Sequence, residues 1–194
     1  HHLDRQRLDV DAVGDVFVEY TKGFEYTPTR RRVTIAPGQR ELTLEIDRWT
    51  DSKLDGYYTG DTHVHFLDPS TSVLEAEAED LNVVNLLAAP WGRLFTNVEN
   101  FTGALDPASK EDRLLWVGQE NRHHMLGHMS LLGMKELVMP FAGGGPDEGY
   151  FGGAEEILMA DWADAAHAQD ALVVAPHFPS PHSELAADIA LGKI

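Results

Sequence analysis

The sequence predicts an α/β fold that follows a smaller β-rich segment. From about residue 56 onward, apolar strand-like runs alternate with helical patterns, which is typical of βα units around a mostly parallel sheet. Before that point the chain shows only short alternating strands and turn signals. Its 194 residues, of which 43% are hydrophobic, are enough to bury a core. We therefore predict a partial β-rich module over 1–55 and an α/β domain over 56–194.

The β-rich segment contains three predicted strands, over 16–20, 32–36 and 41–46. A Pro37-Gly38 turn precedes the third strand, which alternates apolar and polar residues as a strand with one solvent-facing side does. Three strands are few for an independent domain, so we interpret this segment as part of a larger module.

The α/β domain contains strands and helices in alternation. In chain order we predict a strand over 62–66, a helix over 72–82, strands over 83–87, 114–117 and 128–132, a helix over 153–168, a buried strand over 171–175, and a helix from Ser180-Pro181 to Gly192. Ser72 and Glu75 are spaced as a capping box at the start of the first helix. The stretch 88–112 exceeds ordinary loop lengths and predicts a lid or a substrate-binding insertion. Lys193-Ile194 resembles the start of a further strand, so we expect the α/β domain to be incomplete at its C-terminus.

The charge of the chain excludes several classes of partner. Thirty-two Asp and Glu against fifteen Lys and Arg give a formal net charge of −17, most of it in the α/β domain. We therefore expect no nucleic acid partner and no attraction to an anionic membrane surface. No apolar run is long enough to predict membrane insertion, and a chain without cysteine has no thiolate metal site. Such a composition fits either a cytoplasmic or an exported protein.

Histidines are conspicuous in so acidic a chain, and eight of the ten lie in the α/β domain. We exclude His1 and His2 from any site, because a chain that opens with this pair is typical of a trimmed tag. His63 and His65 are two residues apart on a predicted strand, so both imidazoles project from one face and can bind one divalent ion. Three further candidates lie at or beyond other strand ends, where ligand sites of α/β folds gather: Glu120, His128 and His177.

Other catalytic patterns fit less well. The chain has no G-x-S-x-G elbow, no Walker A loop and no H-E-x-x-H helix, and Leu67 stands where a metallo-β-lactamase has its aspartate. An amidohydrolase barrel is a neighbouring alternative, with Lys135 as its only candidate bridging lysine. We interpret His123 and His124 as surface residues. Four aromatic residues in predicted loops are candidates for a pocket wall or for core packing: Trp91, Phe95, Phe101 and Phe141.

Several motifs, in order, resemble those of one known family. Gly60-Asp61-Thr62-His63-Val64-His65 resembles the opening motif of the PHP (polymerase and histidinol phosphatase) metallohydrolases. The preceding Arg48-Trp49 is similar to the lead-in of the CehA/McbA-like (carbaryl hydrolase-like) branch. The later motifs of the resemblance are Gly118-Gln119-Glu120, Gly127-His128 and Ala175-Pro176-His177.

The resemblance implies a distorted (β/α) barrel of PHP type with divalent metals at its C-terminal edge. It also implies that Asp61 accepts a proton from a ligand imidazole and fixes its tautomer. The implied metal ligands are His63, His65, Glu120, His128 and His177.

Two departures from the family pattern reduce the expected number of metals. Ala88-Ala89 stands where most members have an Asp-His pair, and no C-terminal Asp-x-His lies before Ile194. We therefore expect one or two divalent ions, zinc, manganese or iron. The predicted function is a metal-dependent hydrolase that uses activated water on a small-molecule phosphoester, ester or carbamate. The alternative is a non-catalytic metal-binding or interaction module derived from the same fold.

Overall fold

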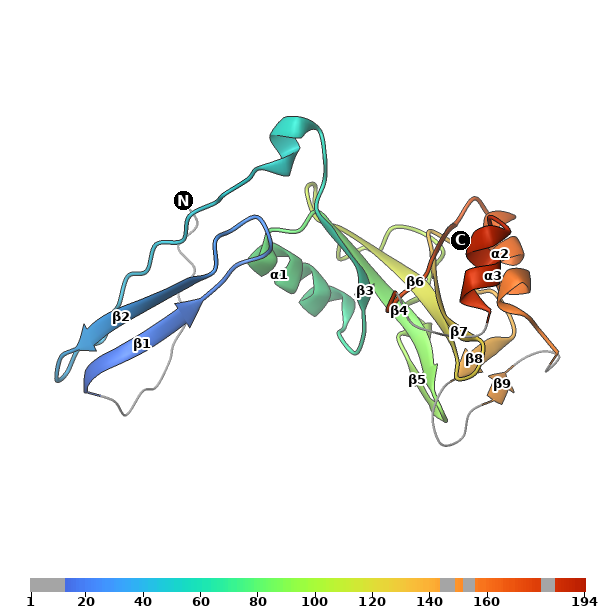
Figure 1. Cartoon of the computed structure of the whole chain (residues 1–194), viewed down its shortest axis with the longest axis horizontal. Coiled ribbons are helices and arrows are strands. Elements are labelled where there is room, and N and C mark those ends of the chain that lie inside the picture. The colour runs from blue at the N-terminus through green and yellow to red at the C-terminus, as the bar shows by residue number, and fades with distance from the viewer. Residues whose placement is uncertain (1–12, 144–148, 152–155, 179–183) are drawn as a thin grey trace. The chain divides into compact units, whose positions relative to one another are not determined.

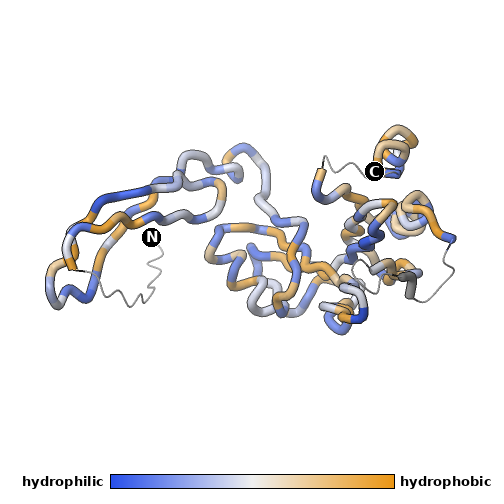
Figure 2. Tube along the Cα trace, turned by 60° about the horizontal axis from the view of Figure 1, so that its bottom comes forward, coloured by the Kyte–Doolittle hydropathy of each residue, from blue (hydrophilic) through white to orange (hydrophobic). Residues whose placement is uncertain are grey.

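The computed structural model describes residues 13–143, 149–151, 156–178 and 184–194. The chain divides into two compact units, His1–Gly56 and Tyr57–Ile194 (Figure 1). Hydrophobic positions occur along the trace of both units (Figure 2). We describe each unit by itself.

The first unit is built on an antiparallel hairpin of β1 (Gly14–Tyr20) and β2 (Thr29–Ile35). Glu19 lies opposite Arg30 in the register, and their side chains form an ion pair at 3.2 Å. Arg32, which lies opposite Phe17, forms a diagonal ion pair with Asp15. The Glu19–Arg30 pair explains why β2 begins before residue 32, where the sequence predicted its start.

The predicted third strand over 41–46 is wrong. These residues form no strand, and the segment is held by an isolated bridge between Tyr26 and Arg48 and by the Tyr20 hydroxyl, which donates to the Glu45 carbonyl at 2.8 Å. Alternation of apolar and polar residues is not sufficient for a strand, because a strand also needs a neighbouring backbone in register. A short 3-10 helix, η1 (Ser52–Asp55), follows.

A buried carboxylate organises the segment that contains Arg48 and Trp49. Glu25 is 5% exposed, forms an ion pair with Arg48, and accepts a hydrogen bond from the backbone N–H of Ser52 at 2.7 Å. The indole N–H of Trp49 donates to the Phe24 carbonyl at 2.8 Å. Arg48 and Trp49 therefore have structural partners within the first unit.

The second unit contains a mixed α/β arrangement around a curled, half-barrel sheet, which confirms the predicted α/β class. The strand order is β10-β7-β6-β4-β3, and β5 pairs with β4. The neighbours β3, β4 and β6 are parallel, whereas β7 is antiparallel to both β6 and β10. The strands of this sheet are β3 (Gly60–Val64), β4 (Val83–Trp91), β5 (Leu94–Thr96), β6 (Leu114–His123), β7 (Gly127–Leu132) and β10 (Leu172–Val174). A separate pair consists of β8 (Phe141–Gly143) and β9 (Gly149–Phe151).

The described part of this unit has three α-helices, α1 (Pro69–Glu79), α2 (Met159–His167) and α3 (Leu185–Ala190). The first begins before the predicted Ser72, because Asp68 is the better N-cap. Its carboxylate accepts from the backbone N–H groups of Ser70 at 2.9 Å and Thr71 at 3.0 Å, and Pro69 occupies the first helical position. None of the described helices has the length and apolar character that crossing a membrane requires.

Several predicted strand ends shift because the buried strands continue beyond the apolar runs that predicted them. β4 continues to Trp91, and with β5 and the short helix η2 (Val98–Asn100) it fills much of the stretch predicted as a lid or insertion. β6 continues to His123, so Glu120 lies inside a strand rather than after one. Trp91, Phe95 and Phe141 consequently lie in strands, not in loops.

The later elements are shorter or less buried than predicted. α2 starts at Met159, and the predicted residues 153–155 lie outside the described part, as does the Ser180-Pro181 helix start. The strand predicted over 171–175 as buried is the edge strand β10, in which Leu172 is 55% exposed. An edge position explains the exposure, because a single neighbour covers β10 within the sheet.

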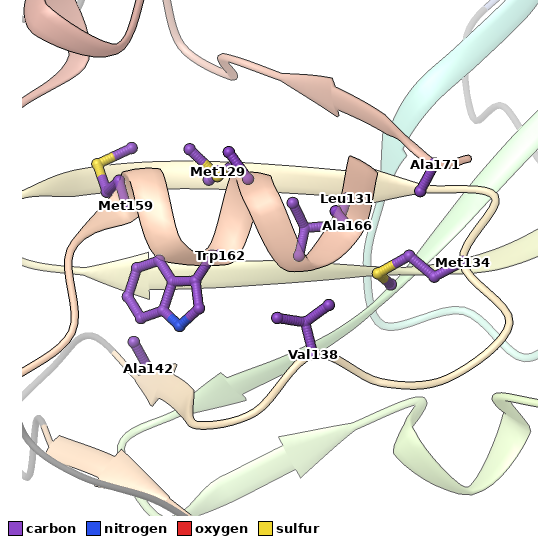
Figure 3. Close-up of a cluster of buried hydrophobic side chains, with 10 residues drawn as sticks. Met129, Leu131, Met134, Val138, Ala142, Met159, Trp162, Ala166 and Ala171 are labelled. Atoms are coloured by element: carbon purple, nitrogen blue, oxygen red, sulfur yellow. The ribbon is translucent and has the colours of Figure 1, made fainter. Parts of the chain in front are cut away.

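Two hydrophobic clusters fix the sheet. In the first, α2 packs Met159, Trp162 and Ala166 against Met129 and Leu131 of β7 (Figure 3). In the second, α1 packs its buried face against apolar residues of β4 and β6. The hairpin of β6 and β7 is therefore packed by both clusters, and this rigid hairpin carries the polar residues described next.

Candidate metal centre

The structure brings the five predicted ligands together from four strands. Two of them sit at the carboxyl end of β3: His63 within the strand and His65 immediately after it. Glu120 lies near the end of the parallel strand β6, and His177 follows β10. His128 opens β7, which is antiparallel to β6, so the start of β7 meets the same edge.

Glu120 is the centre of the cluster. It is fully buried, and its Oε1 lies 3.1 Å from Nδ1 of His128 and 3.6 Å from the Nε2 atoms of both His63 and His177. Its Oε2 lies 2.9 Å from Nε2 of His65. The imidazoles also contact one another, since the ring centroids of His63 lie 4.8 Å from those of His65 and 4.9 Å from those of His177.

This cluster has the composition and spacing of a metal site. The candidate donor atoms of His63, Glu120 and His177 all lie within 4.8 Å of one another. Within the described residues, no group meets the buried Oε2 of Glu120 in hydrogen-bond geometry, and such a buried carboxylate oxygen is costly without a cation nearby. Imidazole and carboxylate ligands suit zinc, manganese and iron. The buried His/Glu cluster could therefore hold a metal ion.

The protonation of the cluster favours cation binding. Burial by itself raises the pKa of Glu120, but the neighbouring imidazoles of His128, His65 and His63 outweigh burial and hold that pKa at about 2. Burial lowers the pKa of His63, and the neighbouring His65 and His177 lower it further against the opposing charge of Glu120. At neutral pH the carboxylate is ionised and His63 is neutral, which is the state that metal coordination requires.

Three further residues complete the surroundings: Arg122 and Ser130, which the sequence analysis did not single out, and Trp91, which it named as a candidate for a pocket wall or for core packing. Arg122 follows Glu120 by two positions on β6, and its Nε lies 3.2 Å from Oε2 of that carboxylate. Ser130 faces Glu120 across the hairpin, and its Oγ lies 3.3 Å from Nδ1 of His63. Trp91 packs edge-on against His65 with ring centroids 5.1 Å apart. The signal for Arg122 and Ser130 was present, because a strand repeats its facing direction every two residues.

Asp61 makes a different contact from the one the resemblance implies. Its Oδ1 accepts a hydrogen bond from the backbone N–H of His63 at 2.9 Å, not from an imidazole. The hydroxyl of Ser130 is the group at Nδ1 of His63. Asp61 therefore fixes the backbone that carries the ligand, and Ser130 is the candidate for fixing the imidazole tautomer.

The remaining candidates lie away from the cluster or have structural contacts. The ring Nδ1 of His123 accepts from the backbone N–H groups of Met125 and Leu126, which organises the turn between β6 and β7. Lys135, the candidate bridging lysine of an amidohydrolase, is exposed and pairs with Asp170 at 3.6 Å.

Two residues at the cluster have a left-handed backbone that favours glycine. Phe66, directly after His65, has φ of 63°, and His177 has φ of 58°. Such conformations cost energy in residues with a side chain, and they concentrate at functional sites. His177 is also half exposed, so the cluster opens to solvent on its side.

Fold and site together define a mixed α/β protein with a candidate metal centre at a sheet edge. Comparison of the chain with family models, with curated proteins and with solved structures finds no match.

Proposed function

We propose that this protein is a metal-dependent hydrolase of the PHP superfamily, similar to its CehA/McbA-like branch. The observation that carries the proposal is the convergence of His63, His65, Glu120, His128 and His177 on one point at the end of the sheet. The ordered motifs of the sequence, and a half-barrel sheet that is consistent with part of a distorted barrel, support it as well.

The chain's own residues would perform three tasks in such a reaction. The imidazoles and Glu120 would hold the ion. Ser130, through Nδ1 of His63, would keep Nε2 of that ring deprotonated and directed at the ion. His177, half exposed, would stand on the side from which water and substrate enter. A bound divalent ion supplies water of lowered pKa and polarises a carbonyl or phosphoryl oxygen, which suits hydrolysis of a phosphoester, ester or carbamate.

A non-catalytic metal-binding module is the second candidate. Ala88 and Ala89 are fully buried in β4, where most family members have ligands, so this strand supplies only apolar side chains there. A cluster with fewer ligands could bind an ion for structural purposes alone.

Metal analysis combined with three assays separates these functions. Purified protein is loaded with zinc or manganese, its metal content is measured, and hydrolysis of p-nitrophenyl phosphate, p-nitrophenyl acetate and an aryl carbamate is followed. We expect bound metal and turnover of at least one substrate class, with both lost in His63→Ala. The matched control is His167→Ala, because His167 is an exposed histidine on α2.

The outcomes are distinct. A protein that binds no metal, or whose activity is equal in wild type and His63→Ala, would overturn the hydrolase proposal. Metal binding without turnover of any substrate class would favour the binding module.

A further inference from the structure

The two oxygens of Glu120 have different surroundings. Oε1 faces the three imidazoles of His63, His128 and His177 at 3.1 to 3.6 Å. Oε2 faces His65 and the guanidinium of Arg122, whose Nε lies 3.2 Å away. A carboxylate that joins two metal ions offers one oxygen to each of them. Here the second oxygen already lies beside a cation that belongs to the protein.

Arg122 packs against Trp91 in this position, although its Nε meets no acceptor in hydrogen-bond geometry within the described residues. Its side chain is 16% exposed, and its guanidinium carbon lies 3.5 Å from the ring centroid of Trp91, which is a close cation–π contact. Trp91 is fixed in turn, because its indole N–H donates to Oγ1 of Thr96 at 3.1 Å. β4 and β6, which carry Trp91 and Arg122, are neighbours in the sheet. The guanidinium therefore has packing on one side and the carboxylate on the other.

The charges of the cluster also disfavour a second metal ion. Glu120 is the carboxylate that contacts the four imidazoles, and its single negative charge is offset by the permanent positive charge of Arg122. One divalent ion makes the cluster strongly positive, and a second ion near Oε2 would stand beside both Arg122 and the first ion. Repulsion at such distances is large in a partly buried site.

We propose that this centre holds a single divalent ion, and that the guanidinium of Arg122 occupies the place a second ion would need beside Oε2 of Glu120. The proposal rests on the proposed function only in requiring that the cluster binds metal. The inference reduces the expected number of bound ions from one or two to one, and it attributes the exclusion of a second ion to Arg122.

Metal stoichiometry tests the inference without any substrate. Wild-type protein is loaded separately with Zn²⁺ and Mn²⁺, and binding is followed by calorimetry and by elemental analysis after gel filtration. Electron paramagnetic resonance of the Mn²⁺ form distinguishes an isolated ion from a coupled pair. We expect one ion per chain and the spectrum of an isolated Mn²⁺.

Variants of Arg122 then test its role. Arg122→Met keeps the apolar stem over Trp91 but removes the charge, and we expect the affinity for a second ion to rise at least about tenfold, with a stoichiometry that approaches two. Arg122→Lys keeps the charge, so we expect one ion. The matched control is Arg113→Met: Arg113 is also largely buried but precedes β6 at its opposite end and pairs with Asp80 and Asp112. We expect one ion there too.

Each outcome decides the matter. Two ions in the wild type would overturn this inference while leaving the metal-dependent hydrolase intact. Arg122→Gln replaces Arg122→Met if that variant does not fold. One ion in the folded variant would show that Arg122 does not prevent the binding of a second ion. Absence of any metal in the wild type would instead remove the proposed function.

Discussion

The two faces of β6 contrast two uses of buried polar residues. On one face, Gln119 bonds the backbone of Val138 twice, with its amide N–H donating to the carbonyl at 2.7 Å and its oxygen accepting from the N–H at 2.8 Å. Asn121 on that face accepts from the Ala142 N–H at 3.1 Å. On the other face, Glu120 and Arg122 approach one another and the imidazoles, but Oε2 of Glu120 and Nε of Arg122 lack hydrogen-bond geometry within the described residues, as does Nδ2 of Asn121 on the amide face.

The difference shows how burial is to be interpreted. Gln119, Glu120 and Asn121 are all fully buried, so burial alone does not separate them. The amide face attaches Val138 and, within β8, Ala142 to the sheet by matching their backbone groups. The charged face gathers carboxylate oxygens and imidazole nitrogens, and a bound cation would satisfy these metal-ligand atoms better than the protein's own groups do. Four experiments test this contrast.

The largest effect is expected from Glu120→Gln. Replacing the carboxylate removes the only charged ligand of the cluster's triad, so we expect the affinity for Zn²⁺ or Mn²⁺ to fall at least about 100-fold. Calorimetric titration measures the loss, and circular dichroism confirms the fold. The control Glu75→Gln changes the same charge at an exposed position on α1 and should leave the affinity unchanged. If Glu120→Gln binds the metal as tightly as the wild type does, the charged face of β6 is not a metal site and the contrast between the two faces fails.

A change on the amide face should act on stability instead. Gln119→Leu leaves the buried N–H and carbonyl of Val138 without partners, which should lower the unfolding free energy by about 2 kcal/mol in urea denaturation. Gln169→Leu is a matched control, because Gln169 accepts from two backbone N–H groups that water can reach, and its loss should cost less. Metal affinity should stay the same in Gln119→Leu; a tenfold fall would place this residue with the site.

A smaller effect is expected from Ser130→Ala. Without the hydroxyl at Nδ1, the tautomer of His63 is less restricted, so we expect metal affinity to fall about tenfold. Ser72→Ala provides the control, since Ser72 is equally buried but its hydroxyl bonds the Asp68 carbonyl at the start of α1. Equal affinities in both variants and wild type would remove Ser130 from the site.

The smallest effect is a pH dependence that arises at the charged face of metal-free protein. His63 has a lowered pKa in the folded state, so the unfolded state binds more protons and stability should fall as the pH drops through about 6.5. Glu120 also has a lowered pKa, of about 2, so its contribution is present above its ordinary range and disappears as the pH falls toward about 2. Denaturation series at several pH values measure both steps, and His63→Gln should remove the first.

Part of the site could be predicted from the sequence because it depends on local geometry. Side chains of a strand point to the same face every two residues, which places His63 and His65 on one face. The same repeat, applied to the hairpin of β6 and β7, would have predicted that Arg122 shares a face with Glu120 and that Ser130 shares a face with His128. The position of Glu120 within β6 was missed, because the polar run Gln119, Glu120 and Asn121 hid a buried strand.

What could not be predicted depends on long-range geometry. His177 was named from its place after a predicted strand and from the family resemblance, but its contact with His63 of the opposite edge depends on the curl of the sheet. Curl accumulates from the twist of every strand pair and has no local pattern in the sequence. The same holds for residues 41–46, whose alternation predicted a strand that lacks a partner backbone. The Asp68 cap is different, because its contacts with Ser70 and Thr71 are local, and it was missed in favour of the capping-box spacing of Ser72.

The meeting of the two edge strands has a consequence for how the domain folds. Because β3 and β10 stand at opposite ends of the strand order, His63 and His177 become neighbours only after every strand between them has paired. An ion bound by both would stabilise the completed sheet and none of its shorter intermediates. Amide hydrogen exchange in β3 and β10 should then slow together when metal is added, so that the two edges of the sheet open as one cooperative unit.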